Sequence, residues 1–92
     1  METNVINYYR IQIEGYKPTE ISVKKIDTAS FLCRLVNLNF INEFNTFGFI
    51  VDVHKYNDPV FIDYGDIPEE FLKKAWEQIF SRIDTPDYAE NI

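Results

Sequence analysis

The side chains best suited to chemistry are those of His54, the only histidine, and the nearby acids Asp52 and Asp63. Residues 47–64 read as two strands joined by a tight turn. A two-residue turn would place Asp52 opposite Asp63. His54 would then face Phe61 on the same side of the sheet. Two carboxylates beside an imidazole can bind a divalent cation or share a proton, although the same side chains also make an ordinary solvated face.

Other chemical signatures are missing from the sequence. Ser22, Ser30 and Ser81 lie in no nucleophile-elbow context, and one histidine would have to serve any triad. The three glycines are too far apart for a phosphate-binding loop, and no Cys/His cluster has zinc-ligand spacing. The single cysteine, Cys33, has leucines close by, which predicts a buried and unreactive thiol. We therefore predict no enzymatic activity, no cofactor and no bound metal.

A capped amphipathic helix follows the two strands. Asp66 and Glu69 have the spacing of a helix N-cap and its capping-box partner, and Pro68 suits the first turn. Two Glu–Lys pairs at i,i+4 spacing would support the helix. Apolar residues recur every three or four positions and predict one buried face. That face comprises Phe71, Leu72, Ala75, Trp76, Ile79, Phe80 and Ile83.

The remaining elements are predicted from alternation and from residue type. Residues 7–14 alternate between apolar and polar side chains and predict a half-buried strand. Residues 20–26 hold Ile21, Val23 and Ile26 with two adjacent lysines, which discourage edge pairing, and predict a second, edge-like strand. Residues 28–46 fit either a helix, from their apolar spacing, or a strand, from a later alternation. We predict a helix, because the run is long and rich in asparagine, which strands disfavour. Pro59 cannot donate a ladder hydrogen bond and predicts a strand start or an edge strand.

Together these elements predict an α+β fold in the order β-β-α-β-β-α. It is a four-stranded antiparallel sheet with two helices packed on one face. The length of 92 residues suits a single domain with one modest core. We expect that domain to span residues 1–84. Residues 85–92 contain a proline and no periodicity, and we expect them to form a flexible acidic C-terminal tail.

The cytoplasm is the expected compartment. No apolar run approaches the ~20 residues that cross a bilayer, so no membrane contact is expected. The N-terminus also lacks the basic and apolar regions of a secretory signal. A single cysteine cannot form an internal disulfide and fits a reducing environment.

Charge is distributed unevenly along the chain, whose net charge is −6. Residues 1–41 hold five basic and four acidic residues, whereas residues 42–92 hold four basic and eleven acidic ones. Acidity disfavours direct nucleic-acid binding and favours a basic surface on a larger protein, although it also keeps small proteins soluble. Tyrosines among the acids suit a protein-binding surface. The predicted partner-binding residues are Asp63, Asp66, Glu69, Glu70, Glu77, Asp87, Tyr64 and Tyr88.

These observations favour a small acidic protein-binding module, monomeric or weakly dimeric. An inhibitor of a nucleic-acid-processing enzyme, of the anti-restriction or anti-CRISPR type, fits them, because clustered carboxylates can occupy a groove shaped for phosphates. A toxin-neutralising immunity protein or antitoxin is an alternative. A small metal-dependent or acid/base enzyme that uses Asp52, His54 and Asp63 is another.

Overall fold

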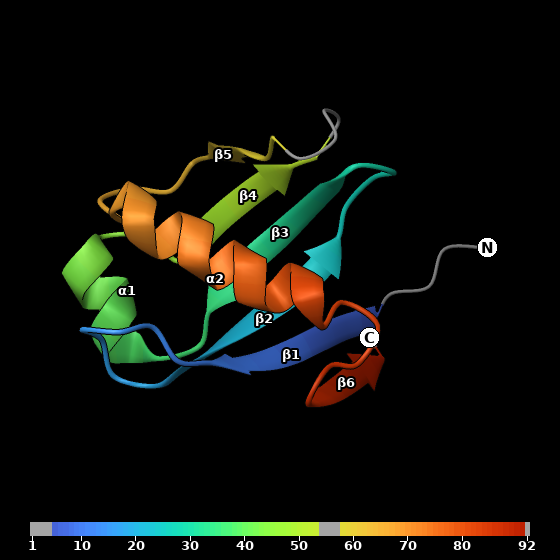
Figure 1. Ribbon diagram of the computed structural model, residues 1–92, viewed down its shortest axis with the longest axis horizontal. Helices are drawn as coiled ribbons and strands as arrows, with labels where there is room; N and C mark the ends of the chain where they lie inside the picture. The colour runs from blue at the N-terminus through green and yellow to red at the C-terminus, as the bar shows by residue number, and fades with distance from the viewer. Residues whose placement is uncertain (1–4, 54–57, 92) are drawn as a thin grey trace.

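Six strands form one antiparallel sheet in residues 5–53 and 58–91, the part of the chain that the computed structural model describes. The strand order is β5-β4-β3-β2-β1-β6, and helix α2 lies across one face of the sheet (Figure 1). Helix α1 packs at one end of the sheet. In chain order the elements are β1 (Val5–Ile11), β2 (Thr19–Lys25), β3 (Ser30–Leu35), α1 (Leu38–Phe44), β4 (Gly48–Asp52), β5 (Val60–Ile62), α2 (Glu69–Ser81) and β6 (Tyr88–Asn91).

The predicted α+β fold with two helices and an antiparallel sheet is confirmed, but the prediction of four strands is wrong. One additional strand, β3, lies within residues 28–46, where we predicted a single helix. It occupies the middle of the sheet, between β2 and β4. Such a strand can carry apolar residues on both faces, so its sequence lacks the alternation that marks a half-buried strand. Strand β2 is also internal, between β3 and β1, so the predicted edge position of residues 20–26 is wrong.

The asparagines of this region mark the ends of a short helix. The side chain of Asn37 accepts a hydrogen bond from the backbone N–H of Asn39 at 2.8 Å and caps the start of α1. Asn45 ends α1 in the left-handed conformation, with φ of 53°. Strand β3 and helix α1 therefore replace the predicted long helix.

The other additional strand, β6, lies within the predicted C-terminal tail. It pairs with β1, so that Tyr8 faces Tyr88 and Val5 faces Asn91. All four of its residues are exposed. Because burial contributes little to β6, its local sequence carries no apolar pattern, and its strand structure comes from pairing with a distant segment.

Helix α2 buries five of the seven residues of the predicted buried face, and it has a different start. Pro68 occupies the N-cap position without a side-chain cap, so the predicted N-cap role of Asp66 is wrong. The side chains of Phe71, Leu72, Ala75, Trp76 and Ile79 are buried, whereas Phe80 is 57% exposed and Ile83 is half-buried beyond the helix. Both predicted ion pairs form, Glu69–Lys73 and Glu70–Lys74, each with an O–N distance of 2.9 Å.

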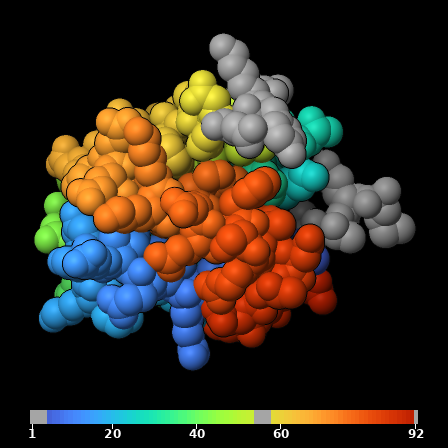
Figure 2. Space-filling model, in the orientation of Figure 1, coloured from blue at the N-terminus to red at the C-terminus, as the bar shows by residue number. Residues whose placement is uncertain are grey.

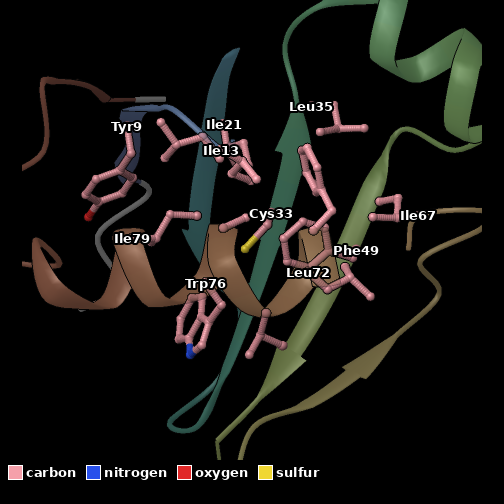
Figure 3. Packing of buried hydrophobic residues seen from close by; sticks show 14 of the residues in the cluster. Tyr9, Ile13, Ile21, Cys33, Leu35, Phe49, Ile67, Leu72, Trp76 and Ile79 are labelled. Atoms are coloured by element: carbon pink, nitrogen blue, oxygen red, sulfur yellow. The ribbon is translucent and has the colours of Figure 1, made fainter. Parts of the chain in front are cut away.

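The hydrophobic core lies between α2 and the sheet (Figure 3). Tyr9, Ile21 and Phe49 reach it from the strands, and the predicted burial of Cys33 among them is confirmed. Burial raises the pKa of the Cys33 thiol strongly, which keeps the group protonated and unreactive. Neither helix of the described residues is long and apolar enough to span a membrane.

Replacing Trp76 by alanine should destabilise the fold severely. Its ring is 5% exposed and lies 5.3 Å, centroid to centroid, from the ring of Phe31. We expect Trp76→Ala to lower the free energy of unfolding by about 3–5 kcal/mol in a urea titration. The more exposed Phe80 is the matched control on the same helix, and Phe80→Ala should cost roughly 1 kcal/mol or less. Equal effects of the two substitutions would contradict this core.

Candidate functional site

The predicted cluster of Asp52, His54 and Asp63 is not supported by the strand register. Asp52 pairs with Val60 rather than with Asp63, so the register differs from the one that a two-residue turn would give. Asp63 follows the end of β5, and His54 lies outside the described residues. Within residues 5–53 and 58–91, no group of three His, Cys, Asp or Glu side chains could hold a metal ion.

The eight residues predicted to bind a partner fall into two separate groups. The first group lies in α2 or in the connection that precedes it, and the second lies at β6, on the opposite edge of the sheet from β5. The structure therefore does not bring all eight residues into one surface. The first group is Asp63, Tyr64, Asp66, Glu69, Glu70 and Glu77, and the second is Asp87 and Tyr88.

Asp87 attaches β6 to the rest of the fold. Its carboxylate accepts a hydrogen bond from the backbone N–H of Arg10 and lies 3.4 Å from the guanidinium of Arg82. The Asp87 N–H also donates to the carbonyl of Tyr8 at 2.9 Å. The hydrogen bond from Arg10, with the Arg82 charge, lowers the pKa of the Asp87 carboxyl. Asp87 is exposed, but its carboxylate is already engaged in contacts within the protein.

Tyr88 makes a second attachment. Its ring stacks on that of Tyr8, with centroids 4.3 Å apart and planes 9° from parallel. Its hydroxyl donates to the Glu20 carboxylate at 2.7 Å, and this bond raises the pKa of Tyr88 to about 12. Glu20 also pairs with Arg10 at 3.6 Å. Tyr88 is thus tied to β1 and β2, in contrast to a freely presented contact residue.

The acids of α2 are partly neutralised by the helix itself. Glu69 and Glu70 pair with lysines one turn later. Both pairs are exposed to solvent, where such pairs add only a few tenths of a kcal/mol to stability but still reduce the local negative charge. Glu77 has no ion pair in the described part of the chain.

Carboxylates without ion pairs gather instead along the β5 edge of the sheet. Asp58, Asp63 and Asp66 are exposed, and none pairs with a basic group in the described ranges. Apolar side chains stand exposed between them on β5, the last strand on this side of the sheet. We call this surface, visible in yellow and gold in Figure 2, the acidic edge. It comprises Asp58, Val60, Ile62, Asp63, Tyr64 and Asp66.

The acidic edge is held in place by the end of α1. Gly65 has φ of +56°, and a Cβ there would lie 2.6 Å from Cβ of Thr46 and 2.9 Å from the carbonyl oxygen of Phe44. The N–H of Asp66 donates to the same carbonyl at 2.8 Å. The side chain of Ile67 is buried. A glycine and a backbone hydrogen bond therefore hold the backbone at Gly65 and Asp66 against the end of α1.

Sequence reasoning missed Asp58, Val60 and Ile62 as members of this surface. Pro59 did indicate an edge or a strand start, and the structure confirms both, since β5 begins at Val60 and ends the sheet. The signal that could have found the surface was this proline followed by a very short strand. In chemical terms the acidic edge offers carboxylates beside exposed apolar side chains, which suits contact with a cationic surface.

Comparison with protein-family models, with curated proteins and with solved structures found no significant match.

Asp87 makes the attachment of β6 sensitive to acid. Because its folded-state pKa is lowered, the carboxylate stabilises the attachment at neutral pH, and this contribution is lost as the pH falls through the lowered pKa. Asp87→Asn at neutral pH should reduce the hydrogen-exchange protection of the β6 amides as acid does in the parent.

The matched control is Asp84→Asn, which removes an exposed carboxylate three residues earlier. It should leave the protection factors of β6 unchanged. If β6 in the Asp87→Asn variant stays as protected as in the parent, the attachment does not depend on this carboxylate.

Proposed function

We propose that this protein is a small acidic binding module that docks through its acidic edge on a basic surface of a larger protein. The observation that carries the proposal is the composition of that edge. Val60, Ile62 and Tyr64 are 51%, 41% and 41% exposed, and they stand among three carboxylates without ion pairs in the described residues.

The two kinds of side chain would act at different stages of binding. Carboxylates on a protein of net charge −6 attract a cationic surface over a distance and so speed the encounter. Exposed apolar side chains, tyrosine above all, supply the short-range contacts that slow dissociation. Glu77 on α2, which has no ion pair among the described residues, would add to this acidic field.

Acids at a sheet edge have an alternative role, which is to prevent edge-to-edge aggregation. The exposed side chains of Val60 and Ile62 favour a binding role, since a merely protective edge gains nothing from apolar surface. The edge is also built on a specific turn at Gly65, which positions it against α1.

We place the partner among nucleic-acid-processing enzymes in the cytoplasm. Grooves that bind nucleic acid are lined by Lys and Arg for contact with phosphates. Carboxylates held at the acidic edge could occupy such a groove and exclude its substrate. This mode is that of an inhibitor of the anti-restriction or anti-CRISPR type. A basic toxin as the partner would instead make the protein an immunity protein or antitoxin.

Neutralising the acidic edge should slow partner association. The variant Asp58→Asn/Asp63→Asn/Asp66→Asn removes three charges, and asparagine tolerates the left-handed conformation of Asp63, whose φ is 53°. The partner would first be captured from the encoding organism, identified and purified. We expect the variant to associate with it about tenfold more slowly than the parent protein does at low salt. Higher ionic strength should slow the parent protein in the same direction.

The matched control is Glu14→Gln/Asp84→Asn/Glu90→Gln, which removes three exposed carboxylates away from the acidic edge. It should associate at a rate within about twofold of the parent, and both variants should melt close to it. Association that is indifferent to salt and equal in the two variants would show that the acidic edge is not the docking surface. A partner whose contact surface is acidic would contradict the proposal directly.

A further inference from the structure

The sheet has a second face, which α2 does not cover (Figure 1). Its side chains alternate along each strand with those of the core. The register places Leu32 opposite Ile50, and Ile50 opposite Ile62. Leu32 and Ile50 are half-buried and Ile62 is exposed, with Ile6 of β1 also half-buried on this face. An apolar row thus extends over the uncovered face.

Two cations beside this row form no ion pair with a carboxylate of residues 5–53 or 58–91. Lys24 lies opposite Leu32, and Arg34 lies opposite Ser22. The two cations are therefore diagonal neighbours on adjacent strands, about 7–8 Å apart at the backbone. Four other cations of the described residues are paired with carboxylates, namely Arg10, Lys73, Lys74 and Arg82.

The same two cations line a shallow groove. Its volume is about 210 Å³, and its walls are Ile6, Ser22, Lys24, Leu32 and Arg34. Two positive charges, one hydroxyl and two aliphatic side chains therefore converge on one depression in an otherwise acidic molecule. This combination accepts a carboxylate that has an apolar neighbour.

We propose that this groove is a second binding site, which takes an acidic segment of a partner protein. A carboxylate of the segment would lie between Lys24 and Arg34, and an adjacent apolar side chain would pack on Ile6 and Leu32. The site is separate from the acidic edge and opposite in charge, so it would bind a different part of a partner or a different partner.

The charges around the groove favour a peptide over a nucleic acid. Glu90 lies opposite Ile6 on the neighbouring strand. Glu20 lies two residues before Ser22 on β2 and so on the same face of the sheet. A continuous phosphate backbone that entered the groove would run into these carboxylates, whereas a peptide can place one or two acids between the cations and neutral residues elsewhere. Face-to-face association of two copies is also disfavoured, since it brings like cations together.

A random dodecapeptide display library, selected on the immobilised full-length protein, tests the proposal. We expect enrichment of peptides in which Asp or Glu adjoins Leu, Ile or Phe. The best peptide, added to ¹⁵N-labelled protein, should shift the backbone amides of β2 and β3. Lys24→Glu/Arg34→Glu should weaken its binding at least about tenfold.

The matched control is Lys17→Glu/Lys25→Glu, the same change of charge at exposed lysines that do not line the groove. It should change the dissociation constant by no more than about twofold. The neutralised acidic edge should bind the peptide as the parent does, so the two sites can fail independently.

Several results would overturn the proposal. They are a library without enrichment, amide chemical shifts that map away from β2 and β3, or equal weakening of peptide binding by the two charge-reversal variants. Tighter binding of a single-stranded DNA oligonucleotide than of the selected peptide would assign the groove to nucleic acid. Self-association that both the Lys24/Arg34 variant and the neutralised acidic edge abolish would assign it to a second copy of the chain.

Discussion

Packing of the apolar face of α2 against one face of the sheet is the interaction on which the rest of the molecule depends. Phe71, Leu72 and Ile79 are almost fully buried there, beside Trp76. A chain of this length can build only one modest core. Because α2 provides that core on one side, it leaves the opposite face of the sheet uncovered, and half-buried residues such as Leu32 remain partly exposed to solvent.

The acids lie at three places in this fold and have three different roles. At β6, Asp87 holds an exposed strand to β1 through polar contacts. On α2, Glu69 and Glu70 are paired with lysines of their own helix. Along the acidic edge, Asp63 and Asp66 lack such partners among the described residues and lie beside exposed apolar side chains. The position of each carboxylate, more than the total charge, decides which of them is available to a partner.

Local patterns predicted the parts of this fold that depend on local interactions. The buried face of α2 follows from apolar spacing, its ion pairs follow from i,i+4 spacing, and the burial of Cys33 follows from its apolar neighbours. Pro59 indicated the edge position of β5 for a steric reason.

The predictions that were wrong concern elements that depend on contacts between residues far apart in the sequence. We predicted a helix over residues 28–46 because the run is long and rich in asparagine, but pairing with β2 and β4 makes part of it the strand β3. Strand β6 lacks an apolar pattern because pairing with β1 stabilises it. The predicted alignment of Asp52 with Asp63 was wrong because it depends on strand register, and Asp52 pairs with Val60 instead. The groove at Lys24 and Arg34 also depends on register, and no local signal in either strand indicates it.

We propose that the carboxylates of the acidic edge contact the partner. Zero-length carbodiimide cross-linking tests this proposal most directly, because it joins a carboxylate to a lysine only when the two groups touch. In the purified complex, mass spectrometry should find partner lysines joined to Asp58, Asp63 or Asp66. Cross-links that involve only carboxylates elsewhere, such as Asp84 or Glu90, would contradict the account.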